Sequence, residues 1–250
     1  MSLSLATVFS CLARTAAVNA AITTRGMQQI GLAYILAPAL RELYPDKEAR
    51  RQALARYAEH TNTHPFAQPL VAGVLINIET ALASGFINED GARKLRKTIP
   101  TALSAVGDSL FSSAVHPCWA LVCCLLLFYG HTVLAAGLTI ALCLLLQCLR
   151  LADFLYGLRY GFDAILKIAA ASPGSWAGPV KVVNGLLAGL ALACLFWHGL
   201  PGMPGYVKAG MALCIPLASW LVFTRFVTPV VFWMAGLLLL ACAGGGTLHL

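Results

Sequence analysis

The feature that most constrains this chain is the near-absence of charge from its second half. Beyond Lys181 the sequence carries two charged residues, Lys208 and Arg225, and all ten acidic residues lie at or before Asp163. A soluble domain carries about 25% charged residues, whereas this chain of 250 residues carries 11% and is 59% hydrophobic. Because so few charges cannot cover a soluble surface of this size, we predict an integral membrane protein.

Long apolar runs supply the predicted membrane-crossing helices. Residues 228–248 form a run of 21 residues, which at about 1.5 Å per residue reaches roughly 31 Å, the thickness of a bilayer core. Three further runs are slightly shorter: 131–149, 182–198 and 207–224. The stretch 118–130 has 13 residues and is too short to cross alone. We therefore expect it to continue from residues 99–117 through a broken or re-entrant helix.

These runs predict an all-α polytopic membrane protein with about five membrane-crossing helices, confined to a transmembrane domain at residues 99–250. Residues 1–98 alternate apolar and charged stretches, which predicts interfacial and cytoplasmic helices with a re-entrant segment near 62–87. Residues 1–21 lack a basic start, and Arg14 interrupts their apolar part. An amphipathic interfacial helix is therefore expected there rather than a signal peptide.

Charge placement predicts the orientation. Three basic stretches are expected in the cytoplasm by the positive-inside rule: residues 41–60, 93–97 and 150–181. Alternation of the later crossings then places Leu250 outside. The net charge of +7 includes no long basic run, so no nucleic-acid partner is expected. The nine cysteines form no C-x-x-C pair and no zinc-like spacing with histidine, so no metal and no cofactor is expected.

One polar stripe stands out within the apolar half. Ser104, Asp108, Ser112 and His116 recur every four residues, so a helix brings them onto one face, with Ser109 beside them. An aspartate at the centre of a membrane helix costs about 2.5–3.5 kcal/mol on insertion scales. The stripe therefore needs a polar partner on another subunit or a passing solute, and the sequence leaves both interpretations open.

A second set of polar residues lies just before and within the apolar stretch 66–87. Asn62 and Thr63 fit a helix N-cap as well as a ligand role, and Glu79 has no cation near it in its stretch, so its partner is expected from elsewhere. Sugar hydroxyls both donate and accept, which suits carboxylate, amide and imidazole groups. The candidates for substrate binding or partner contact, none of them catalytic, are Asn62, His64, Asn77, Glu79, Asp108, Ser109, Ser112 and His116.

The same stretches resemble the IID component of the mannose/fructose/sorbose family of the bacterial phosphotransferase system. The resemblance follows the chain in order through Arg25–Tyr34, Pro38–Pro45, Asn62–Phe66, Gly107-Asp108 and Arg150–Gly161. It implies a subunit of the bacterial cytoplasmic membrane that pairs with a IIC subunit to form the path of a hexose-type sugar. It also implies that soluble IIA and IIB components carry the phosphoryl group, so this subunit itself is not expected to be catalytic.

Two other functions remain open. The family commonly has two adjacent acids where this chain has Glu79-Thr80, and a Trp where it has Ser112, which leaves room for a non-transporting assembly subunit. A more remote alternative is an intramembrane aspartyl protease, because Ala105-Val-Gly-Asp108 approximates a G-x-G-D motif. That chemistry needs a second aspartate, and Asp153 and Asp163 lie in a stretch where pairing with arginine is expected instead.

Overall fold

The computed structural model describes residues 3–199, 202, 204–207 and 209–210. The chain divides into two compact units, Met1–Asn184 and Gly185–Leu250, and each is considered by itself. All regular structure in the described residues is helical, apart from isolated backbone bridges of Met27 with Thr23 and Thr61. The all-α prediction is confirmed for this part of the chain.

Four short helical elements open the first unit: α1 (Leu5–Arg14), the 3-10 helix η1 (Thr15–Ala21), α2 (Gln29–Leu43) and α3 (Lys47–Ala55). Side-chain caps begin two of them, because Ser4 accepts from the N–H of residue 7 and Asp46 accepts from that of residue 49. Helix α1 buries Cys11 and exposes 88% of Leu5 and 70% of Phe9. It is amphipathic, as expected.

Helix α4 (Gln68–Ala83) is the centre of the first unit and is buried along most of its length. It packs against α7 (Thr132–Tyr160) through two glycines. A Cβ on Gly73 would lie 2.3 Å from the carbonyl oxygen of Phe154, and one on Gly157 would lie 2.6 Å from that of Leu70. The two backbones therefore touch at this crossing, as small residues allow between closely packed helices.

The longest helical stretch in the described residues runs through three elements: α5 (Glu89–Gly107), the π-helical η2 (Asp108–Val115) and α6 (His116–Phe128). We expected a break that feeds a short membrane helix; instead the helix is continuous over 40 residues. Pro117 has no N–H to donate to the preceding turn, and its ring crowds the carbonyl four residues earlier. The widened π-helical turns lie immediately before this proline and carry the helix past it.

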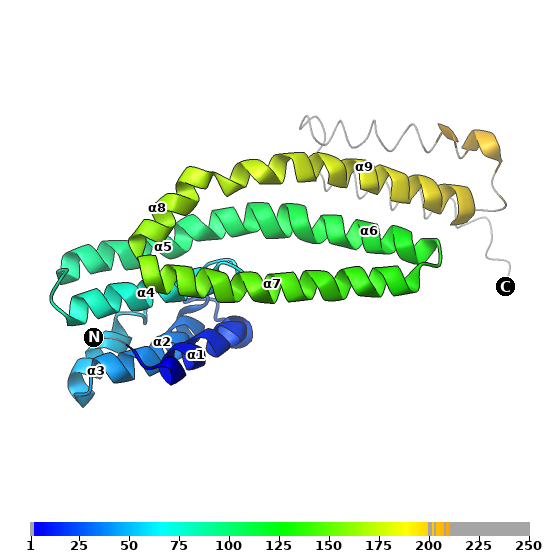
Figure 1. Ribbon diagram of the computed structural model, residues 1–250. Coiled ribbons are helices and arrows are strands. Elements are labelled where there is room, and N and C mark those ends of the chain that lie inside the picture. Colours follow the sequence, from blue (N-terminus) through cyan, green and yellow to red (C-terminus); the bar gives the residue numbers. More distant parts are fainter. Residues whose placement is uncertain (1–2, 200–201, 203, 208, 211–250) are drawn as a thin grey trace. The chain divides into compact units, whose positions relative to one another are not determined.

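Helices α6 and α7 form an antiparallel hairpin and run side by side (Figure 1). The basic stretch 150–181, expected on the cytoplasmic side, is largely helical: α7 continues to Tyr160 and is followed by α8 (Phe162–Ala171) and α9 (Pro173–Gly199). Gly161, with a φ of +55°, makes the turn between α7 and α8.

Two helical stretches in the described residues are long and apolar enough to cross a membrane, Glu89–Phe128 and Thr132–Tyr160. The predicted crossing segment 182–198 falls within α9, whose second part opens the second unit. Residues 205–207 and 209–210 of that unit are helical. The predicted segments 207–224, beyond its first residues, and 228–248 lie outside the described residues, so the number of crossing helices stays a prediction.

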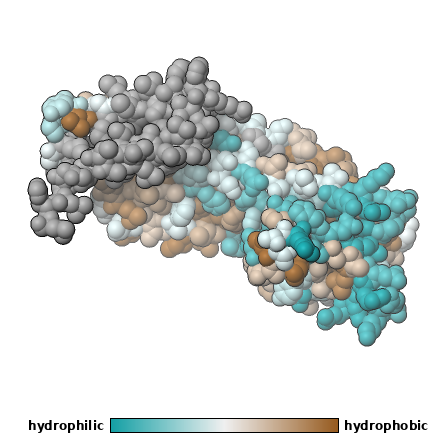
Figure 2. Space-filling view, turned by 180° about the vertical axis from the view of Figure 1, so that it is seen from behind, coloured by the Kyte–Doolittle hydropathy of each residue, from teal (hydrophilic) through white to brown (hydrophobic). Residues whose placement is uncertain are grey.

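The hydrophilic part of the surface of the first unit lies mainly at one end (Figure 2). Hydrophilic residues gather where α3 and the start of α5 lie, and apolar residues become frequent further along the long helices. Helix α7 exposes many large apolar side chains, among them Val133, Leu134, Ile140, Leu144 and Leu145. An apolar surface of this extent suits lipid or a partner subunit rather than water.

Candidate functional site

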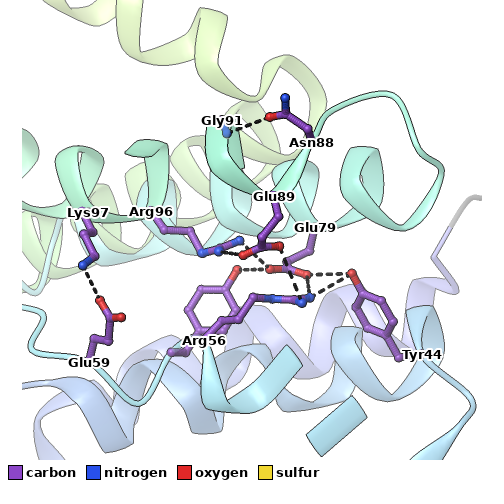
Figure 3. Close-up of polar contacts among 10 residues, drawn as sticks. Tyr44, Arg56, Glu59, Glu79, Asn88, Glu89, Gly91, Arg96 and Lys97 are labelled. Atoms are coloured by element: carbon purple, nitrogen blue, oxygen red, sulfur yellow. Dashed lines mark hydrogen bonds and ion pairs between the residues drawn. The ribbon is translucent and has the colours of Figure 1, made fainter. Parts of the chain in front are cut away.

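Glu79 lies near the end of α4 and is 1% exposed. One carboxylate oxygen accepts from the hydroxyl of Tyr44 at 2.9 Å and from Nη2 of Arg56 at 2.8 Å. The other accepts from the hydroxyl of Tyr57 at 2.8 Å and from Nη1 of Arg96 at 3.4 Å (Figure 3). The partners that we expected from elsewhere therefore come from this chain, from the ends of α2 and α3 and from α5.

A second carboxylate completes this charged cluster. Glu89, at the start of α5, pairs with Nη2 of Arg96 and lies 3.7 Å from Nη1 of Arg56. Two arginines thus meet two glutamates, and the side chain of Arg96 is only 7% exposed. Buried charges are tolerated when they are paired and hydrogen-bonded in this way. The arrangement fixes the ends of α3, α4 and α5 to one another.

The cluster predicts a loss of stability at alkaline pH. Burial, followed by the charge of Glu79 and the hydrogen bond to it, raises the pKa of Tyr44 to about 12. Because this folded-state pKa lies above the unfolded value near 10, the contribution is complete below about pH 10 and is lost as the pH rises towards about 12.

We therefore expect thermal stability, followed by circular dichroism in detergent, to decline across that window. The decline should be shallower in Tyr44→Phe, whereas Tyr206→Phe, at an exposed position, should match the unmodified chain. An equally steep decline in Tyr44→Phe would contradict this assignment.

The loop before α4 is fixed by Gln28. Its side chain donates to the carbonyl of Thr63 at 2.8 Å and accepts from the N–H of Thr63 at 2.9 Å, and its own N–H donates to the carbonyl of Thr61 at 2.9 Å. Helix α4 begins at Gln68 with Ala67 as its N-cap residue. The capping interpretation of Asn62 and Thr63 is therefore wrong, and the loop is held by α2 instead.

This loop presents His64 to the π-helical segment. Its Nε2 lies 3.0 Å from the hydroxyl of Ser112, and its ring stacks on Phe111 with 5.4 Å between centroids. Phe66 packs against both Phe111 and His116. A Cβ at position 107 would lie 2.3 Å from that of His64, so a glycine there is what lets the histidine approach the helix.

Asp108 lies at an exposed position on the same segment. Its carboxylate accepts from Ser104 Oγ at a long 3.5 Å, and its carbonyl accepts from Ser113 Oγ at 3.0 Å. In the π-helical turns the hydroxyl of Ser113 thus bonds to the backbone carbonyl five residues earlier. Ser109 accepts from Nζ of Lys181 at 3.3 Å. Asp108, Ser112 and Ser113 are all exposed, and they form the exposed polar segment of this long helix.

Of the predicted residues, the structure brings His64, Ser112 and His116 together, with Asp108 and Ser109 on the same helical segment. Asn62 lies apart from them in a cavity beside α5. Asn77 instead donates to the carbonyl of residue 158 at 2.9 Å and so ties α4 to α7. Glu79 occupies the opposite end of α4 from His64.

Sequence reasoning missed one further polar residue at this segment. Asn184 is buried on α9 and donates from Nδ2 to the carbonyl of Ala114 at 2.9 Å, while its Oδ1 has no partner in the described part of the chain. An asparagine within an apolar run was the available signal. A π-helix changes the pairing of its backbone carbonyls, and the side chain of Asn184 bonds to one of them.

Among the residues that the structure describes, no group of three or more His, Cys, Asp or Glu side chains is placed to hold a metal ion.

Long apolar helices, an apolar surface and an exposed polar segment define a helical membrane protein. The chain matches the family described as PTS system mannose/fructose/sorbose family IID component over residues 2–175. It belongs to this family.

The curated relatives agree with that family. The chain is 32% identical over 155 residues to the PTS system mannose-specific EIID component of Escherichia coli (strain K12), which covers 60% of this chain and 52% of the relative. It is 28% identical over 156 residues to the fructose permease IID component of Bacillus subtilis (strain 168), covering 62% and 55%. The matched region thus spans about half the length of these relatives.

Two solved structures share the fold. One, described as the structure of a membrane protein, has a TM-score of 0.76 at 22% identity and covers 98% of both chains. The other is a cryo-EM structure of the mannose transporter ManYZ in complex with microcin E492, with a TM-score of 0.56 at 23% identity over 98% of this chain and 97% of that one.

Proposed function

We propose that this chain is a membrane subunit of a sugar-transporting phosphotransferase system, and that it forms the path of a hexose-type sugar together with a IIC subunit. The observation that supports this most is the family match over residues 2–175. The relatives named above are described as mannose-specific and as a fructose permease, which supports a hexose as the solute.

The exposed polar segment supports the same function. Asp108 and Ser112 lie at exposed positions on a helix long enough to cross a bilayer, where uncompensated polar groups are costly. Hydroxyl groups of a sugar, or polar groups of the companion subunit, would satisfy them. In this proposal His64 and His116 border the segment that meets the sugar or the IIC subunit.

The location and the partners follow from the proposed function. The protein is a membrane protein of the family, and we place it in the bacterial cytoplasmic membrane with about five crossings. The hydrophilic end with α3 and the start of α5 would face the cytoplasm, and Leu250 the outside. Soluble IIA and IIB components would carry the phosphoryl group, so this chain needs no cofactor and no catalytic residue of its own.

The two alternatives are less well supported. The family match does not favour a protease, and the contacts of the Asp108 side chain in the described residues are with Ser104 rather than with another acid. If this chain were an assembly subunit that does not contact the sugar, only polar groups of the companion subunit would be available to bond to the exposed Asp108.

The decisive experiment is sugar uptake by Asp108→Asn. Loss of a hydrogen bond to a charged group costs about 1.5–3 kcal/mol, so uptake of radiolabelled hexose should fall by about tenfold or more. Copurification with the IIC subunit should be retained. Asp163→Asn, which changes an exposed acid at the start of α8, should leave uptake unchanged. Normal uptake by Asp108→Asn would favour the assembly subunit.

A further inference from the structure

A polar groove lies beside α5, separate from the ring contacts of His64 and His116 with Phe66 and Phe111. Two cavities form it, of about 260 Å³ and 230 Å³, and both are bordered by His60, Thr61, Arg96 and Lys97. Because the two cavities share these four residues, they form one groove between α5 and the loop that follows α3. The cavity nearer to α6 ends at Ser104.

The lining of the second cavity is rich in hydrogen-bond donors. Lys97 supplies an ammonium group and Arg96 a guanidinium group whose charge is balanced by Glu79 and Glu89. Thr61, Thr101 and Ser104 supply hydroxyls, and Asn62 supplies an amide. The described residues that border this cavity include no carboxylate, whereas those of the first cavity include Glu59, Glu89 and Asp90. The second cavity is therefore suited to an anion that also carries hydroxyl groups.

The walls of the cavity are held without a ligand. The N–H of Thr61 donates to the carbonyl of Gly26 at 3.3 Å, and its carbonyl accepts from Gln28. On the opposite wall, Arg96 is fixed by Glu79 and Glu89. Binding to such a preformed site does not require the walls to be ordered first.

Lys97 is held only by an exposed ion pair among the described residues of the groove. Its ammonium lies 3.0 Å from Glu59, and the two side chains are 54% and 53% exposed. Exposed ion pairs contribute little, about 0–1 kcal/mol. An incoming dianion would therefore compete readily with Glu59 for this ammonium group.

We propose that the second cavity binds a phosphomonoester attached to a polyhydroxylated ring, namely a phosphorylated hexose. This inference rests on the proposed function, since a phosphotransferase system produces such a compound. The phosphate would meet Lys97 and Arg96, and the ring hydroxyls would meet Thr61, Thr101 and Asn62.

The position of the cavity along the helix agrees with a role after transport. Ser104 borders the cavity and also donates to Asp108 on the exposed polar segment. The groove thus begins where that segment ends, and along α5 it extends to Glu89 and Asp90 in the first turn of the helix, which belongs to the hydrophilic end of the unit. A phosphorylated sugar in this cavity would lie between the path of the sugar and the cytoplasm.

The test uses the full chain in nanodiscs and isothermal titration calorimetry with hexose 6-phosphate, the free hexose and inorganic phosphate. We expect hexose 6-phosphate to bind at least about tenfold more tightly than either other compound, since only it offers both groups. Lys97→Gln and Thr101→Val should each lower the affinity for hexose 6-phosphate, and Lys97→Gln should lower it by about tenfold or more. Lys94→Gln, at an exposed position on the same helix outside the cavity lining, should not.

Other outcomes overturn the proposal. Equal affinity for inorganic phosphate would mean a simple anion site, and undetectable binding of hexose 6-phosphate by the unmodified chain would mean no site. Retention of phosphatidylglycerol from mixed nanodiscs that depends on Lys97, without sugar phosphate binding, would assign the cavity to a lipid headgroup. Failure of the proposed function is a separate result, because it would appear as normal hexose uptake by Asp108→Asn.

Discussion

Glu79→Ala is expected to destabilise the chain by about 3–5 kcal/mol, because it leaves two buried or half-buried arginines without their shared carboxylate. Arg56 and Arg96 both donate to this side chain, as do Tyr44 and Tyr57. Burial by itself lowers the pKa of Arg56, but the hydrogen bond and charge of Glu79 raise it overall, so the arginine stays charged. Denaturant titration in mixed micelles, monitored by circular dichroism, would measure the loss.

A matched control is available on α3. Glu48 forms an exposed ion pair with Arg51 at 3.1 Å, and such pairs contribute about 0–1 kcal/mol. Glu48→Ala should therefore unfold close to the unmodified chain. A loss in Glu79→Ala no greater than that in Glu48→Ala would show that the cluster does not hold the helix ends together.

This prediction also separates stability from transport. If Glu79 served as a sugar contact, Glu79→Ala would lower uptake while the amount of folded subunit stayed constant. The partners seen in the structure lead us to expect the opposite, a fall in folded subunit that accounts for most of the lost uptake. Uptake normalised to folded protein, measured beside Asp108→Asn, distinguishes the two cases.

The second large effect is expected at the crossing of α4 and α7. A Cβ at position 73 would lie 2.3 Å from the carbonyl oxygen of Phe154 and 2.8 Å from the amide nitrogen of Leu158. Both are backbone atoms, so the helices must separate to accommodate any side chain. Such overpacking costs about 1–3 kcal/mol and sometimes more. We expect Gly73→Ala to lower the free energy of unfolding by this amount. We expect Gly73→Val to prevent accumulation of the folded subunit.

Gly137 provides the comparison for that experiment. It lies on α7, and a Cβ there would meet nothing within 4 Å. Alanine is favoured over glycine inside a helix by about 0.5–1 kcal/mol, so Gly137→Ala should be neutral or slightly stabilising. Equal unfolding curves for Gly73→Ala and Gly137→Ala would contradict the close contact between the two backbones.

The helical class of this protein could be predicted from sequence because hydropathy is a local property. Apolar runs identified the region of α6 and α7. The stretch 99–117 covered η2 and only the second part of α5, because residues up to 98 were assigned to the interfacial and cytoplasmic part. The residues at which the helices begin and end were less predictable. The shortness of the run 118–130 suggested a break before it, yet π-helical turns carry the helix past Pro117. The charges of the basic stretch 150–181 gave no sign of the helices α7 and α8 that occupy it.

The candidate site was predictable in part for a related reason. The four-residue spacing from Ser104 to His116 placed these groups on one helix, and periodicity requires no knowledge of the partner helices. The partners of Glu79 lie 23 residues earlier, at Arg56, and 17 residues later, at Arg96. Only the packing of α2 and α5 against α4, with α3 packed on α2, brings them together, and no local pattern reports that packing.

The π-helical segment has a geometrical consequence for the long helix that contains it. Each residue of an α-helix turns the chain by about 100° and advances it by about 1.5 Å. A π-helical turn holds an additional residue, so closing one such turn into α geometry would rotate the part beyond it through roughly the angle of one residue. Whether the segment from Asp108 to Val115 has π-helical or α-helical geometry therefore sets which face of α6 lies on the same side as the polar face of α5.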